Sequence, residues 1–130
     1  MKNTMSDNEK RNKLMELMRH FDTAMLVTQS IEGGLHSRPL AVAEAGQDGS
    51  LSFSTAIESA KVLELRDDPR VNVVMQDGKR FVSLTGRARI CRDGALVDRL
   101  WSESWRICFP QGKADASLAI VLVEPEHVKL

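Results

Sequence analysis

The sequence predicts a mainly β protein with a few helices (α+β), in which six antiparallel strands close into a small barrel. Apolar and polar residues alternate along several short segments, and most of these segments are separated by glycine-containing turns. The helical stretches are few and lie between hairpins, so a parallel β-α-β arrangement is not expected. A single antiparallel sheet in a chain of this length tends to close on itself.

The composition is that of one globular domain. The 130 residues are 42% hydrophobic and 28% charged, and 18 basic residues balance 18 acidic ones. We therefore expect one domain over residues 1–130, with 1–5 as a disordered tail. The zero net charge argues against a nucleic-acid partner. No apolar run is long enough for a membrane span, and the charged N-terminal region is unlike a secretory signal, so a cytoplasmic protein is expected.

The strands and the first helix follow from the hydrophobic period. Ser6 and Glu9 form a capping-box pattern ahead of an apolar stripe at helical spacing, which runs from Leu14 to Phe21. A period close to two then predicts strands at 23–30, 35–45, 50–55, 70–76, 81–91 and 118–124.

Two residues inside these strands refine the prediction. Pro39 lacks an amide donor, so its strand is expected at a sheet edge or with a bulge. Gly86 indicates a bulge or a close backbone approach within the long strand 81–91.

Two further helices are expected. One covers 56–66, with Ala60, Val62 and Leu63 on its apolar side, and ends at Asp67-Asp68-Pro69. The other begins after Asp93, which is expected to cap it.

Hydroxyl and cationic side chains gather where strand 50–55 meets the next helix. This stretch contains Ser54, Thr55, Ser59 and Lys61. Free amides at a helix N-terminus, hydroxyl donors and a lysine favour an anion such as phosphate. The alternative is simple helix capping by Thr55 or Ser59, with a solvated lysine.

Arg38, followed by Pro39, lies on the preceding strand of the same predicted hairpin. If strands 35–45 and 50–55 pair, the Arg38 guanidinium can converge with the serine-rich loop on one anion, because its fork gives two parallel bonds to phosphate. The alternative is an exposed arginine on an edge strand.

Three of the six aromatic residues, Trp101, Trp105 and Phe109, lie within nine residues of irregular chain. They can form a satellite core under a loop or a dimer contact. They can also form a flat wall for an aromatic ligand ring.

No metal site and no catalytic residue can be singled out. His20, His36 and His127 lack zinc-type spacing, and Cys91 and Cys108 fit small, half-buried apolar residues. The absence of an evident acid or base suits a protein whose cofactor carries the reactivity.

Several segments together resemble the FMN-binding split barrels, the relatives of pyridoxamine 5′-phosphate oxidase. The tryptophan-containing segment is similar to the general stress protein 26 group within them. The segments are SRPL (37–40), LSFSTAIESAKVLEL (51–65), DDPRVNV (67–73), VSLTGRA (82–88), WRICFPQGKAD (105–115) and VEPEH (123–127).

The resemblance implies a six-stranded split barrel that forms a homodimer with flavin at the interface. It implies that FMN, or FAD, is bound by Arg38 and Pro39 and by the hydroxyl-and-lysine stretch Ser54, Thr55, Ser59 and Lys61. The Trp101 or Trp105 region of the partner subunit would cover the flavin ring. The C-terminal Arg and His substrate motif of the oxidase has no counterpart here, so pyridoxamine-phosphate oxidation is not expected.

Three functions remain open on this basis. The first is an FMN-dependent oxidoreductase of the general stress type, with a nicotinamide or another small molecule as electron donor. The second is a non-catalytic flavin carrier or sensor. The third is a deazaflavin-binding or haem-binding version of the same barrel.

Overall fold

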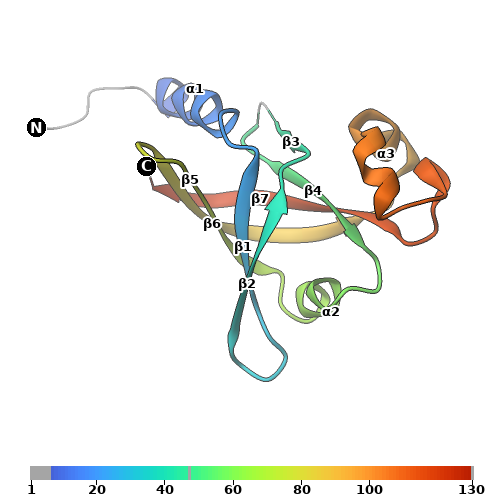
Figure 1. Cartoon of the computed structure of the whole chain (residues 1–130). Helices are drawn as coiled ribbons and strands as arrows, with labels where there is room; N and C mark the ends of the chain where they lie inside the picture. The colour runs from blue at the N-terminus through green and yellow to red at the C-terminus, as the bar shows by residue number, and fades with distance from the viewer. Residues whose placement is uncertain (1–6, 47, 130) are drawn as a thin grey trace, which may run out of the picture.

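In the computed structural model, which describes residues 7–46 and 48–129, seven strands, three α-helices and two short 3-10 helices follow one another (Figure 1). They are α1 (Asp7–Met18), β1 (Thr23–Gln29), β2 (Leu35–Ala41), β3 (Glu44–Ala45), β4 (Leu51–Ala56), α2 (Ala60–Asp67), β5 (Arg70–Gln76), β6 (Phe81–Cys91), α3 (Gly94–Leu100), η1 (Glu103–Ile107), η2 (Gly112–Ala114) and β7 (Leu118–Lys129). The expected tail and the Ser6 capping box lie outside the described residues.

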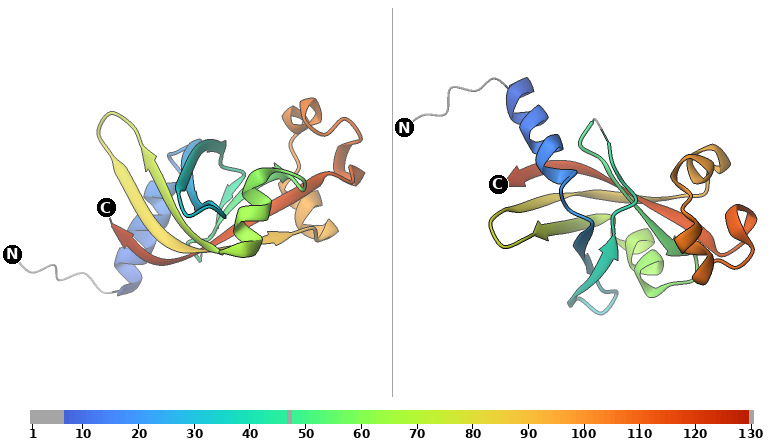
Figure 2. Two further views of the ribbon diagram at one scale, coloured as in Figure 1. Left: turned by 90° about the horizontal axis from the view of Figure 1, so that it is seen from below. Right: turned by 45° about the horizontal axis from the view of Figure 1, so that its top comes forward.

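All of these strands join one antiparallel sheet in the order β2-β1-β5-β6-β7-β4-β3. β2 and β3 are therefore at opposite edges, yet only residues 42 and 43 separate them in the chain. Because the three Cα steps from Ala41 to Glu44 reach at most about 11 Å, the two edges must come together. The sheet is rolled into a barrel, and Figure 2 shows α1 and α3 at opposite ends of it.

The seam of the barrel explains why the strand count differs from the prediction. The expected strand 35–45 is divided into β2 and β3, because its backbone changes partners at the seam. The Val42 amide donates to the Asp22 carbonyl at 2.8 Å, and the Ala43 amide donates to the Ser52 carbonyl at 2.7 Å. β2 and β4 come into contact there without pairing as a ladder, which makes the barrel a split one.

The two special positions in the strands behave as the sequence predicts. β2, with Pro39, is an edge strand. Gly86 is both a bulge and a close approach: the register shifts beside it, and an added Cβ would lie 2.2 Å from the Glu124 carbonyl oxygen. β7 continues past the predicted end at Glu124, because the bulge accommodates Pro125 opposite Gly86.

Helix α2 differs from the prediction in where it begins and in which side chains it buries, and both differences matter for the site. α2 begins at Ala60 rather than at 56, after a turn closed by the Ser59 amide on the Ala56 carbonyl. Leu63, expected on the buried side, is 54% exposed, and Glu64 is buried in its place. Asp93 caps α3 as expected, accepting a hydrogen bond from the Ala95 amide at 3.0 Å.

Helix α2 also ends as the sequence predicts, at Asp67. Within the part of the chain that the structure describes, no helix is both long enough and apolar enough to cross a membrane.

Two hydrophobic clusters use opposite faces of β7. The larger cluster fills the barrel and includes Val121 and Val123. The smaller cluster includes Ile120 and packs β7 against α3 and the 3-10 segment, so α3 lies outside the barrel (Figure 2). The buried members of the smaller cluster are Val97, Leu100, Phe109, Leu118 and Ile120.

Replacing Gly86 with alanine is expected to destabilise the fold by at least about 2 kcal/mol, because the new methyl group would overlap the backbone of a paired strand. Chemical denaturation followed by circular dichroism measures this. Gly78→Ala in the β5–β6 turn is the matched control, since nothing lies within 4 Å of its Cβ position. Equal stability of the two variants would contradict the close-approach interpretation.

Candidate anion-binding site

Lys61 and two hydroxyl groups meet where β4 leads into α2. The Lys61 Nζ donates to Thr55 Oγ1 at 2.7 Å, and Thr55 Oγ1 lies 3.3 Å from Ser59 Oγ. Ser59 occupies the N-cap position of α2, but its side chain makes no capping hydrogen bond. The hydroxyls therefore face each other and the lysine instead of capping the helix, which favours the anion-site interpretation over the capping alternative.

Arg38 joins this group from β2, by a route that the sequence did not predict. The expected pairing of strands 35–45 and 50–55 holds only for residues 44 and 45, which form β3 and pair with β4. β2, the part that carries Arg38, pairs with β1 instead. The rolled sheet and α2 bring the residues together instead. The Arg38 guanidinium donates to Thr28 Oγ1 at 2.7 Å and to Glu64 Oε1 at 3.0 Å.

The charge of Arg38 acts on Lys61. The pKa of Lys61 is lowered from its ordinary value, first by burial and second by the positive charge of Arg38. Both effects disfavour the charged ammonium, and a bound anion would reverse them. The arrangement of two cations and two hydroxyls can thus hold a phosphate group, with the oxygens accepting from Lys61, Arg38, Thr55 and Ser59.

Glu64 is a member of the site that the sequence analysis missed. It is only 4% exposed, and its carboxylate binds Arg38, Thr28 and His36. The Nδ1 atom of His36 lies 2.8 Å from Glu64 Oε2. One pattern in the sequence could have indicated it. His36 and Arg38 are two basic residues on one face of a strand, and such a pair favours a nearby carboxylate partner.

Two of the sequence-predicted residues lie apart from the group. Successive side chains of a strand point to opposite faces, so Pro39 faces away from Arg38, and Ser54 faces away from Thr55. Ser54 is opposite Ile120 in β7, a member of the outer cluster, whereas Thr55 is opposite Ala119.

Trp101 and Trp105 pack together against the outer cluster. Their ring centroids are 5.7 Å apart with the planes at 75°, an edge-to-face contact, and the Arg106 guanidinium lies 5.5 Å from the Trp101 ring centroid. Both are half-buried, while Phe109 is fully buried beneath them. The satellite-core interpretation is correct for Phe109, and the tryptophans retain exposed surface.

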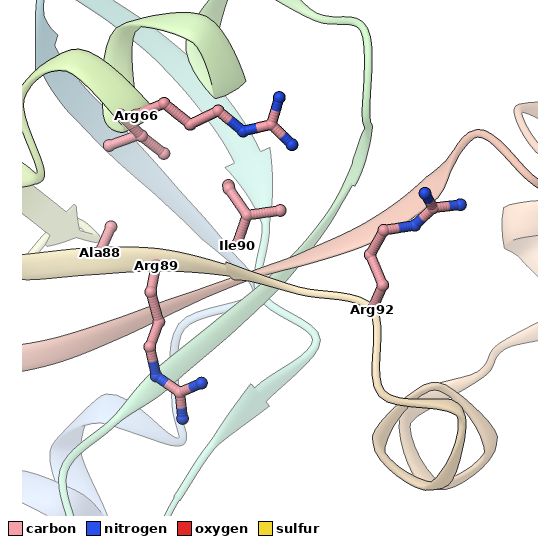
Figure 3. Close-up of a pocket in the computed structure, with 6 residues that line it drawn as sticks. Arg66, Ala88, Arg89, Ile90 and Arg92 are labelled. Carbon is pink, nitrogen blue, oxygen red and sulfur yellow. The ribbon is translucent and has the colours of Figure 1, made fainter.

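A second basic feature is a shallow hollow of about 470 Å³ between the end of α2 and β6 (Figure 3). Arg66 and Arg92 rise on the same side of β6 as Ile90, whereas Arg89 points to the other side. Arg92 is engaged by the Ala116 carbonyl, and Arg89 lies 3.5 Å from Glu124. Because Arg89 points to the other side of β6 and none of the described residues that line the hollow carries a hydroxyl group, the hollow offers an anion fewer kinds of donor than the Lys61 group.

A rolled antiparallel sheet with a short helix across its seam defines the class of split β-barrel proteins. The family model described as "Pyridoxamine 5'-phosphate oxidase like" matches residues 9–130. The chain belongs to this family, which confirms the resemblance found in the sequence.

Several of the similar proteins are named general stress proteins. General stress protein 26 of Bacillus subtilis (strain 168) is 27% identical over 131 aligned residues, covering 97% of this chain and 91% of the relative. The solved structure of general stress protein 26 from Bacillus anthracis str. Sterne has a TM-score of 0.81 at 19% identity, covering 92% of each chain. The general stress FMN/FAD binding protein of Xanthomonas citri has a TM-score of 0.78 at 28% identity, covering 93% of this chain and 87% of that one.

Proposed function

We propose that the chain binds FMN, or the larger FAD, through its phosphate group at Arg38, Lys61, Thr55 and Ser59. The observation that carries this is the convergence of donors at the start of α2: Lys61 Nζ contacts Thr55 Oγ1 at 2.7 Å, and Ser59 Oγ lies 3.3 Å from the same hydroxyl. The positive charge of Arg38 also acts on Lys61, whose pKa is lowered first by burial and second by that charge. A phosphate dianion satisfies both cations and both hydroxyls. The name of the Xanthomonas citri relative, an FMN/FAD binding protein, supports the same ligand.

The proposed assembly is a homodimer in which the partner subunit's tryptophan segment covers the flavin ring. The support is the outer face of β1, which carries Met25 and Val27 beside Val74 of β5, none of them fully buried. A second copy is the natural cover for such a face. Trp101 and Trp105 lie on the other side of the sheet from Lys61, so within one chain the sheet separates them from the site.

The proposed role is that of an FMN-dependent oxidoreductase of the general stress type. Bound FMN supplies the redox chemistry, accepting a hydride from a reduced nicotinamide or another small donor. The residues of the chain bind the phosphate, orient the flavin and exclude water from it. Reduction of the bound flavin by NADH or NADPH at useful rates distinguishes this role from that of a non-catalytic carrier, and the absorption spectrum distinguishes flavin from deazaflavin or haem.

Replacing Lys61 with methionine, which keeps the apolar stem, is expected to weaken FMN binding about ten- to a hundred-fold, since one charge-assisted bond is lost. Riboflavin, which lacks the phosphate, should bind the variant as it binds the wild type. Fluorescence titration with both flavins measures this. Arg38→Ala should act in the same direction but also destabilise the fold, because it leaves the buried Glu64 without its guanidinium.

The matched control for Lys61 is Lys79→Met, on an exposed turn away from the site. A parallel loss of FMN and riboflavin affinity in the Lys61 variant would show that the phosphate lies elsewhere.

Trp105→Leu is expected to weaken FMN binding several-fold and to relieve quenching of the bound-flavin fluorescence, since an aromatic stack adds about 0.5–1.5 kcal/mol beyond buried area. Trp101 is engaged by Glu103 and Arg106, so Trp101→Leu should have the smaller effect. Emission of the FMN-saturated variants measures both. The reverse order of effects would assign the ring contact to Trp101.

The dimer is tested at Met25, which is 38% exposed on the outer face of β1. Wild-type protein should scatter light as a particle of about twice the 14.5 kDa chain mass. Met25→Glu should give a folded monomer with weakened FMN binding, because charge on this face opposes association. Glu16→Gln, on the exposed side of α1, is the control. A wild-type monomer that binds FMN fully would refute the interfacial site.

A further inference from the structure

The buried carboxylate of Glu64 binds two further side chains besides Arg38. Its Oε1 accepts hydrogen bonds from Thr28 Oγ1 and Arg38 Nη2, both at 3.0 Å, while its Oε2 faces His36 Nδ1 at 2.8 Å. An unpaired carboxylate at this depth would be costly. Glu64 therefore holds two basic side chains of β2 in fixed positions, one with each oxygen.

The charges of this cluster do not match those of a phosphate monoester. Arg38 and Lys61 contribute two positive charges, and Glu64 removes one. A phosphate monoester carries about −1.5 to −2 charges at pH 7. When His36 is neutral, the cluster is therefore short of about half to one positive charge, and an imidazole is the side chain that can gain one near this pH.

We propose that His36 is a further phosphate-binding residue of this site, positioned by Glu64, and that it takes up a proton when the phosphate group binds. The inference rests on the proposed flavin phosphate site and adds to it a residue and a proton. His36 shares one face of β2 with Arg38, because the two are two residues apart on the strand. Its side chain is 58% exposed, so the Nε2 atom is open to a ligand while Nδ1 is held by Glu64.

The charged groups near His36 are of both signs. Glu64 of α2 lies against the imidazole, Arg38 is two residues along the same strand, and Lys61 is one turn before Glu64 on α2. The facing residues of β1 and β4 at the site, Thr28 and Thr55, are uncharged. A bound dianion offsets the two cations, so the balance changes toward the imidazolium when phosphate arrives.

Isothermal titration of FMN at pH 7, in buffers with different heats of ionisation, measures the proton directly. The proposal predicts uptake of a fraction of a proton, at most one, for each FMN bound. The FMN phosphate alone gives an effect of the opposite sign, because preferential binding of its dianion releases a small fraction of a proton. Because the complex then holds more protons than the free molecules, wild-type affinity should also fall from pH 7 to pH 8, by at most about ten-fold for one proton.

His36→Gln should abolish the proton uptake and flatten this pH dependence, while riboflavin binding should show neither effect in any variant. His20→Gln, in the exposed turn after α1, is the matched control and should behave as wild type. Uptake that persists in His36→Gln would assign the proton to Lys61 and overturn the proposal. Wild-type FMN binding without proton uptake would overturn it as well.

A second readout separates this inference from the flavin assignment. The imidazole signals of His36 are followed by NMR against pH, with and without inorganic phosphate, and phosphate should displace the His36 titration curve to higher pH while leaving His20 unchanged. Failure of both flavins to bind would refute the proposed function alone. An unmoved His36 curve in saturating phosphate would refute the present inference, whatever the flavin result.

Discussion

The molecule depends on one constraint of chain length: residues 42 and 43 must join opposite edges of the same sheet. β2 pairs with β1 at one edge, and β3 pairs with β4 at the other, so two residues of backbone require the sheet to roll up. The same closure places Arg38 of β2 next to α2 and within electrostatic reach of Lys61. The candidate anion site is thus a consequence of the seam, and residues that are not hydrogen-bonded neighbours in the sheet share it.

A carboxylate at the seam makes this convergence possible. Glu64 enters the buried side of α2 at a position that an apolar residue would ordinarily occupy, while Leu63 faces solvent at 54% exposure. Two basic side chains of β2 and the hydroxyl of Thr28 surround it. This anion offsets one of the two positive charges that Arg38 and Lys61 bring to the seam. A buried ion pair contributes little net stability by itself, so its value here is in fixing the position and the charge of the site.

Local patterns in the sequence predicted the local elements well. The period-two segments gave the strands, Gly86 indicated the bulge, and Asp93 marked the start of α3. Long-range features were not predictable in this way. The prediction that strand 35–45 pairs with 50–55 along its length treated consecutive strands as a hairpin, whereas only residues 44 and 45 pair there and barrel closure gives β2 another partner. Glu64 was missed because its burial depends on Arg38 and His36, which lie 26 and 28 residues away in the chain. The apolar periodicity of a helix carries no information about such distant partners.

The two faces of β4 and β7 bear on why one chain would present only part of the proposed flavin site. Thr55 faces the barrel side and contacts Lys61, whereas Ser54 is opposite Ile120, which belongs to the cluster that carries the tryptophans. The alternation of a strand keeps these two sets on opposite sides. A ligand held by Lys61 therefore has the sheet between itself and Trp105 of the same chain. If the tryptophan segment covers the ring of such a ligand, the segment has to belong to a second copy of the chain. For this physical reason the proposed ring contact depends on the proposed dimer.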